Sequence, residues 1–294
     1  MPGKKILFIG KGSDRDPGFE GLTIEGITYQ NWMERKGIFV FEKEIVESCH
    51  GCPDLMNQYS EELQKRVDAG DRVVGIFSGG LYLALSSLQA TQVTFPIISV
   101  PTDLVAYQAF MVPSGHAVVA GVGVDKGGQI LNKEYETTQR VKALRLAQRI
   151  LTLEFEEVCI VGDESNGKLE KKLLDFGIKY RTSSESHLLH LSYSKYDQKE
   201  VYPYVSCLIR ADSDEDMNDW NYLRNSEQRN HIYDFGNPIN TVPFAQVRGV
   251  DNLAIYAAKI LSLQRHDLRQ KLIDMKVGKR KTYEQRDLSS ELAD

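Results

Sequence analysis

Short apolar segments, each followed by glycine or a small polar residue, recur along this sequence and alternate with segments of helical spacing. "KKILFIG" (4–10) is one of them, and "DRVVGIFSGG" (71–80) and "EEVCIVGDESNG" (156–167) repeat the pattern. Most are apolar throughout rather than at every second residue, which is typical of strands buried on both faces of a parallel sheet. We therefore predict an α/β fold, a flavodoxin-like three-layer sandwich with parallel sheets.

The same criteria predict further elements. The segment after Pro53 carries Leu55, Tyr59 and Leu63 at helical spacing and closes on Gly70, a common helix stop. Other strands are expected at 37–48, 95–101, 115–124, 202–212 and 240–249. Other helices are expected at 81–91, 132–153, 168–177 and 250–264.

The pattern restarts near residue 155, which suggests a degenerate internal repeat. The segment 240–249 parallels 113–123, and the helical segment after each of them is also similar. The alternative is that any two α/β units look alike at this level. We predict a first unit at 1–154, a degenerate second unit at 155–265, and a C-terminal helix and tail at 266–294. The last segment is charged with few apolar anchors, so we expect it to pack across another subunit or to end disordered.

Composition limits the partners that this chain is expected to have. The net charge of -5 gives no electrostatic reason to expect nucleic-acid binding. No stretch approaches the roughly 20 apolar residues of a membrane span, and nothing reads as a signal peptide. Four cysteines in 294 residues do not make a disulfide scaffold. We therefore predict a reducing, cytoplasmic setting.

The first loop that could bind a ligand is "IGKGSDRD" (9–16). Gly10 and Gly12 permit a tight turn and close approach of the backbone to a ligand. Ser13 and Asp14 add a hydroxyl and a carboxylate that suit a phosphate or a ribose. An ordinary strand-to-loop turn has the same composition. The Walker sequence is excluded, because no Gly-Lys-Ser/Thr follows at the required spacing.

The second loop, "ESCHGCPD" (47–54), contains Cys49 and Cys52 with His50 between them. A redox pair at a helix N-terminus is one interpretation, and half of a metal site is another. Cys159 and Cys207, inside apolar runs, look like buried core residues rather than further ligands. His50 is the better candidate for a function, because imidazole moves protons near neutral pH. A loop histidine without a function remains the alternative.

The third loop, "FSGGLYL" (77–83), brings Ser78, Gly79 and Gly80 to the junction of a strand and a helix. Bare backbone at a helix N-terminus suits contact with a planar ring or a carboxylate. In an open parallel sheet, ligands bind at the carboxyl ends of the strands, so the three loops are expected to share one edge.

The order of these loops resembles the aminoimidazole ribonucleotide carboxylase and carboxyaminoimidazole ribonucleotide mutase family of purine biosynthesis. "GKGSD" (10–14) resembles that family's Gly-Ser-x-Ser-Asp loop, with Lys11 in place of the first serine. "SCHGCP" (48–53) matches its Ser-Ala-His-Arg/Lys-x-Pro at Ser48, His50 and Pro53. Weaker similarities are "SGG" (78–80), "FPIISVP" (95–101), "VPSGHAVVAG" (112–121) and "DNLAIYAAKIL" (251–261).

The resemblance implies a lyase or isomerase that moves a carboxyl group on an aminoimidazole ribonucleotide, without a metal or an organic cofactor. It gives the proton shuttle to the catalytic residue His50. Substrate binding falls to the glycines, serines and polar residues of the three loops, namely Gly10, Lys11, Ser13, Asp14, Ser48, Ser78, Gly79 and Gly80. The partners implied are a small ribonucleotide and CO2 or bicarbonate. The chain would be a homo-oligomer, a tetramer that mimics the family's octamer.

Two positions depart from the family. Gly51 stands where the family has a basic residue, and Leu83 lies near the position of a histidine in the bacterial mutases. The inserted segment 15–26 also lengthens the first loop. A catalytically impaired nucleotide-binding or assembly protein of the same fold is therefore one alternative. A carboxylase acting on a related heterocyclic nucleotide is another. His187, in "SESH", is not expected to form a second site.

Overall fold

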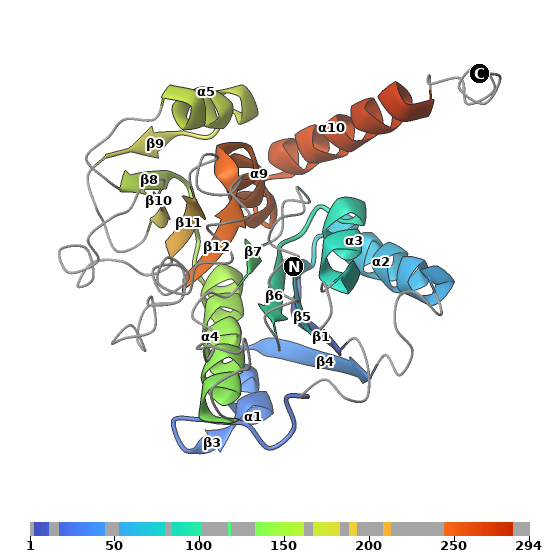
Figure 1. Cartoon of the computed structure of the whole chain (residues 1–294), viewed down its shortest axis with the longest axis vertical. Coiled ribbons are helices and arrows are strands. Elements are labelled where there is room, and N and C mark those ends of the chain that lie inside the picture. Colours follow the sequence, from blue (N-terminus) through green and yellow to red (C-terminus); the bar gives the residue numbers. More distant parts are fainter. Residues whose placement is uncertain are drawn as a thin grey trace, which may run out of the picture.

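The computed structural model describes residues 3–11, 18–44, 53–79, 84–101, 117–118, 133–161, 167–182, 188–192, 208–212 and 244–284. Within these ranges, ten strands form one sheet, and a separate two-stranded hairpin lies outside it. Helices cover the sheet on both sides, which gives the predicted three-layer α/β arrangement (Figure 1).

The first half of the sheet has the strand order β4-β1-β5-β6-β7. The strands are β1 (Lys5–Lys11), β4 (Ile38–Glu44), β5 (Arg72–Gly79), β6 (Ile97–Pro101) and β7 (Ala117–Val118). All neighbouring strands in this half are parallel. Counted along the chain, the order is second, first, third, fourth, fifth, which is that of flavodoxin-like folds.

The second half of the sheet repeats this order as β9-β8-β10-β11-β12. Its strands are β8 (Val158–Val161), β9 (Tyr180–Arg181), β10 (Leu189–Ser192), β11 (Leu208–Asp212) and β12 (Phe244–Arg248). They too are parallel to one another. The two halves join through β7 and β12, which are antiparallel where Val118 pairs with Gln246. Duplication, with a boundary near residue 154, stays a prediction that this strand order agrees with.

Six longer helices and one short helix occur in the described residues. Those of the first half are α1 (Tyr29–Glu34), α2 (Pro53–Asp68), α3 (Ala84–Gln92) and α4 (Lys133–Thr152). The later ones are α5 (Gly167–Phe176), α9 (Gly249–Ser262) and α10 (His266–Glu284). The sequence predicted each of the longer helices to within about three residues, a usual error for helix ends. It did not predict α1 or the strand β10.

Both faces of the first half are covered, as the apolar strands require. Leu7, Phe8 and Ile9 are consecutive residues of β1 and are all buried, so both faces of the strand are shielded from water. The Phe8 ring lies 6.2 Å from the Tyr59 ring of α2. Helix α4 contacts β1, β5 and β6. Figure 1 shows α2 and α3 on one side of these strands and α4 with α1 on the other.

Glycine ends two of the helices at the positions where the backbone needs a positive φ. Gly70 follows α2 with φ +98, and Asp71 N donates to Arg66 O at 3.0 Å. Gly177 follows α5 with φ +71, and Ile178 N donates to Leu173 O at 2.8 Å. Both are Schellman motifs, which satisfy carbonyl groups that the helix end leaves open. The prediction that Gly70 stops its helix is confirmed.

The inserted segment 15–26, where it is described, is not a simple extension of the first loop. Strands β2 (Thr23–Ile24) and β3 (Ile27–Thr28) form an antiparallel hairpin. Its two turn residues, Glu25 (φ 55) and Gly26 (φ 79), both have the positive φ of a type I′ turn. Buried apolar side chains at Phe19, Leu22 and Ile24 attach the hairpin to the core.

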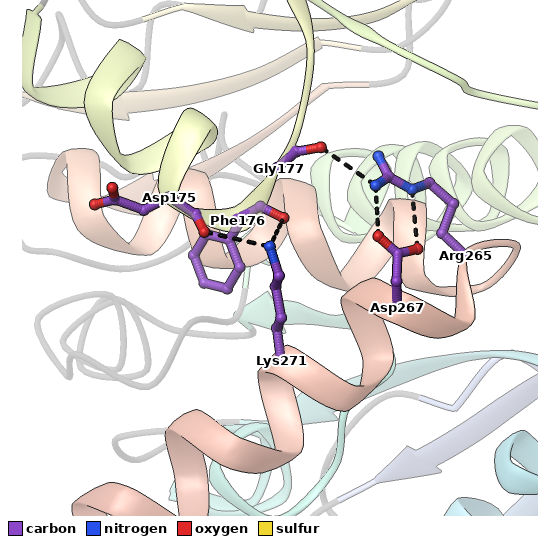
Figure 2. Close-up of polar contacts among 6 residues, drawn as sticks. All are labelled: Asp175, Phe176, Gly177, Arg265, Asp267 and Lys271. Atoms are coloured by element: carbon purple, nitrogen blue, oxygen red, sulfur yellow. Dashed lines mark hydrogen bonds and ion pairs between the residues drawn. The ribbon is translucent and has the colours of Figure 1, made fainter.

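The first turns of helix α10 pack on the described part of their own chain, and the expectation that the segment 266–294 packs across another subunit or ends disordered stays a prediction. Lys271 Nζ donates to Phe176 O at 2.9 Å and lies 3.4 Å from Asp175 O, at the carboxyl end of α5. Arg265 also donates to Gly177 O at 3.2 Å and binds the Asp267 carboxylate at 2.6 Å (Figure 2). These cations meet the open carbonyl groups and negative dipole end of α5, which explains where the helix docks.

Candidate functional site

The carboxyl ends of the first-half strands lie at one edge of the sheet, in register. Lys11, the last residue of β1, pairs with Glu44 of β4 on one side and with Ser78 of β5 on the other. One residue beyond Ser78, Gly79 pairs with Pro101, the last residue of β6. The segments 12–17, 45–52 and 80–83 therefore all begin at this edge, next to one another.

Four of the predicted site residues belong to the described strands. Gly10 and Lys11 end β1, and Ser78 and Gly79 end β5. Ser78 is completely buried, whereas Lys11 is half-buried. The other predicted site residues lie outside the described residues, and their roles stay predictions: Ser13, Asp14, Ser48, His50 and Gly80.

Ser78 and Gly79 are strand residues rather than loop residues. Ser78 pairs with both Lys11 and Val100, because β5 lies between β1 and β6. Backbone groups inside a sheet are committed to neighbouring strands, which limits what they can offer to a ligand. The bare backbone that the sequence predicted for this loop therefore begins after Gly79.

A contact that the sequence did not predict lies near the carboxyl ends of these strands. The Tyr29 hydroxyl, at the start of α1, donates to the Glu42 carboxylate of the edge strand β4. Burial, and then the hydrogen bond to Glu42, raise the pKa of Tyr29 far above its ordinary value. Tyr29 therefore stays a neutral donor and holds α1 against β4. The two residues are 13 positions apart, and no periodicity in the sequence connects them.

The structure tests only part of the two other interpretations of the cysteines, a redox pair and a metal site. Cys159 is completely buried in β8, which confirms its predicted place in the core. The pair Cys49 and Cys52 lies outside the described residues, as do Cys207 and His187. Within the described ranges, no group of three or more His, Cys, Asp or Glu side chains is arranged to hold a metal ion.

The second half has its own carboxyl edge. Ser192 of β10 pairs with Val161 and Arg210, and Asp212 of β11 pairs with Arg248. Because β7 and β12 are antiparallel, this edge points away from the edge formed by Lys11 and Ser78. The strand ends of the two halves therefore do not combine into one site.

Every helix in the described parts of the chain is too short or too polar to cross a membrane.

Comparisons with known proteins give little further information. No protein-family profile matches the chain, and no curated protein matches it. Among solved structures, the chain is similar to a probable cytoplasmic L-asparaginase from Campylobacter jejuni, with 11% identity and a TM-score of 0.26. The match covers 93% of this chain and 99% of the asparaginase. A likeness this weak carries no argument about function, so the site has to be judged by its own residues.

Proposed function

We propose that this chain transfers a carboxyl group on an aminoimidazole ribonucleotide, as a mutase or carboxylase of de novo purine biosynthesis. The observation that supports the proposal is the register of β4, β1 and β5. Because Lys11 pairs with both Glu44 and Ser78, the three segments that resemble the family's site start side by side. A flavodoxin-like sheet binds its ligands at this edge.

In the proposed reaction, His50 moves the proton. Carboxylation of the imidazole ring carbon requires that a proton leave it, and decarboxylation requires that one return. An imidazole exchanges protons readily near neutral pH, which suits both directions. Cys49 and Cys52 are neighbours of His50 without a part in the chemistry.

Substrate binding is proposed for the residues around that histidine. Ser13 and Asp14 orient the ribose phosphate, and Lys11 supplies a positive charge at the end of β1. Ser48 and the segment formed by Ser78, Gly79 and Gly80 hold the carboxylate that is transferred. Lys11 is of particular interest, because Gly51 stands where the family has its basic residue. The substrate phosphate needs a positively charged partner, and a lysine binds phosphate as a point charge.

One assay tests the proposal directly. The protein is incubated with aminoimidazole ribonucleotide and bicarbonate, or with the carboxylated isomers, and ultraviolet absorbance is followed. Turnover supports the proposed chemistry. Thermal stabilisation by the ribonucleotide without turnover favours the alternative of a binding or assembly protein. The differences from the family's sequence at Gly51 and Leu83 support that alternative. A result that shows no turnover and also no thermal stabilisation would overturn the proposal.

Replacement of His50 tests its role. We expect His50→Asn to lower turnover by about 10²–10⁴-fold, the usual contribution of general acid–base catalysis, while ribonucleotide binding is retained. His266→Asn is a matched control, because it removes an exposed imidazole at the start of α10. The double variant Cys49→Ala, Cys52→Ala should keep its activity. Full activity in His50→Asn, or an inactive but folded cysteine variant, contradicts the assignment.

The proposal also includes a setting and an assembly. A purine-pathway enzyme of this kind acts in the cytoplasm on a soluble nucleotide and on CO2 or bicarbonate. If the chain contains two fused units, four chains reproduce the number of units in the family's octamer. We therefore propose a homotetramer.

A further inference from the structure

The segment 12–17, the first candidate ligand loop, lies between two residues that the rest of the chain fixes. Lys11 before it is the last residue of β1 and is paired on both sides within the sheet. Gly18 after it accepts a hydrogen bond at its carbonyl oxygen from Arg140 Nη1. Arg140 belongs to α4 and is 122 positions away in the sequence. A helix from the end of the first half therefore reaches the end of this loop.

The chain is anchored from the next residue onward. Phe19 is 1% exposed, and its ring lies 6.1 Å from the ring of Tyr29 at the start of α1. Leu22 N donates to Phe19 O at 3.2 Å, and Tyr29 N donates to Leu22 O at 3.0 Å. Gly18 is therefore the residue between a fixed hairpin and the loop.

A glycine at this place would leave the loop free to pivot. Glycine has the widest choice of backbone conformations, so the anchor at Phe19 does not by itself set the direction of the preceding chain. The Arg140 guanidinium binds the carbonyl group of Gly18 itself and removes that freedom. A hydrogen bond from a charged donor is also stronger than one between neutral groups.

Helix α4 is a firm support for this contact. It lies on the same side of the sheet as α1 (Figure 1) and contacts β1, β5 and β6. Ala143 and Leu144, three and four residues after Arg140, are completely buried. Arg145 of the same helix lies 3.8 Å from Glu25 in the hairpin turn, but the Glu25 side chain is 63% exposed. An exposed ion pair contributes little, so Arg140 is the stronger connection.

We propose that Arg140 is a positioning residue for ligand binding: by fixing Gly18, it sets the direction of the loop that carries Ser13 and Asp14. The ligand, an aminoimidazole ribonucleotide, rests on the proposed function, whereas the effect of Arg140 on the loop does not. A loop that is held at both ends before the ligand arrives loses less conformational entropy on binding. Arg140 therefore raises the affinity for the ribonucleotide and takes no part in proton transfer by His50.

Amide hydrogen exchange of the ligand-free protein tests the effect on the loop. We expect Arg140→Met, which keeps an apolar stem but removes the donors, to speed exchange in 12–19 and to leave β5 unchanged. Arg145→Met is the matched control, because it removes the contact with Glu25 and should leave exchange in 12–19 at the wild-type rate. Unchanged exchange in Arg140→Met, or an equal change in both variants, overturns the proposal.

Ribonucleotide binding tests the consequence for the site. Arg140→Met should weaken binding of aminoimidazole ribonucleotide by roughly 3–10-fold in calorimetry, because the loop is then ordered at the expense of binding. Turnover at saturating ribonucleotide should stay unchanged. Arg140→Lys should recover most of the affinity, since an ammonium group can also donate to Gly18 O. A fall in kcat at unchanged KM contradicts a positioning role.

A double-mutant cycle separates positioning from a general loss of structure. If Arg140 acts through the loop, Arg140→Met should weaken binding less in a Ser13→Ala background than in the wild type. Equal losses in the two backgrounds would show that Arg140 does not act through Ser13's loop. If the wild type binds no ribonucleotide, the proposed function fails, and the exchange comparison then decides on Arg140 by itself.

Discussion

Two lysines buried in the second half of the chain show how much a single residue can cost. Lys259 of α9 is 1% exposed and donates to Ala90 O, in the last turn of α3, at 2.8 Å. Burial lowers its pKa well below the ordinary value, and the charges of Lys276 and Lys279 lower it further. Lys276 is also largely buried, and its Nζ has no hydrogen-bond partner within the described part of the chain. Burial of a charge without a partner is unfavourable, so these amines favour the neutral form.

Lys276 makes stability depend on pH. Burial lowers its pKa to about 7, below the ordinary value of 10.5, so the unfolded chain takes up a proton that the folded chain releases between these values. Stability should therefore rise with pH across this window, by at most ~1.4 kcal/mol per pH unit for one group. We expect Lys276→Met to be more stable than the wild type near pH 7 and to show a smaller pH slope.

Urea unfolding at pH 7, 8 and 9 measures this effect. Lys281→Met is the matched control, since Lys281 is an exposed lysine of the same helix and its loss should leave the slope unchanged. Equal slopes in the wild type and in Lys276→Met would show that folding does not lower the pKa of Lys276. Part of the slope should remain in the variant, because Lys259 titrates in the same direction.

At the scale of elements, helix and hairpin ends are held by groups distant in sequence. Arg269 of α10 donates to Val67 O near the end of α2 and, at 3.3 Å, to Ser262 O at the end of α9. It therefore connects the two halves through carbonyl groups at the ends of two helices. The hairpin is fixed in a similar way, since Glu25 accepts from Trp32 Nε1 at 3.3 Å and lies 3.8 Å from Arg145 of α4.

Loss of the Arg269 bridge should be costly. Arg269 is 6% exposed, and its removal leaves two buried carbonyl groups with fewer donors. We expect Arg269→Leu to lower the free energy of unfolding by about 1–3 kcal/mol, because Ser262 O loses this donor whereas Val67 O keeps the hydrogen bond from Gly70 N. Arg35→Leu, at an exposed position after α1, should change it by less than about 0.5 kcal/mol. Denaturant midpoints compare the two, and equal effects would mean that Arg269 has no bridging role.

The same substitution should act in opposite directions at two glycines. Gly26, in the hairpin turn, has φ +79, and Gly278 lies inside α10. We expect Gly26→Ala to destabilise by about 1 kcal/mol, because a Cβ disfavours positive φ. Gly278→Ala should stabilise by about 0.5–1 kcal/mol, because nothing lies within 4 Å of the added Cβ and alanine favours the helix. Thermal unfolding of both variants checks the signs, and a stabilised Gly26→Ala would exclude the type I′ turn.

At the scale of the whole molecule, the parts that the sequence predicted correctly depend on local patterns. The apolar run at 4–10 and the helix that stops at Gly70 are both where periodicity and a glycine signal put them. Helix α1, the hairpin and β10 were missed. Strand β10 was missed because "LHLS" (189–192) is short and its buried His190 reads as polar. Of the candidate site, the sequence predicted which strand ends share an edge. It could not predict that Ser78 stays inside β5, because strand length depends on β1 and β6.

The single antiparallel joint between β7 and β12 decides how the halves could cooperate. With their strands running in opposite directions, the two halves open toward opposite poles of the molecule. Any intermediate released at one pole would have to travel through bulk solvent to reach the other. A ligand held at the strand ends of one half therefore has to be bound by the residues of that half alone.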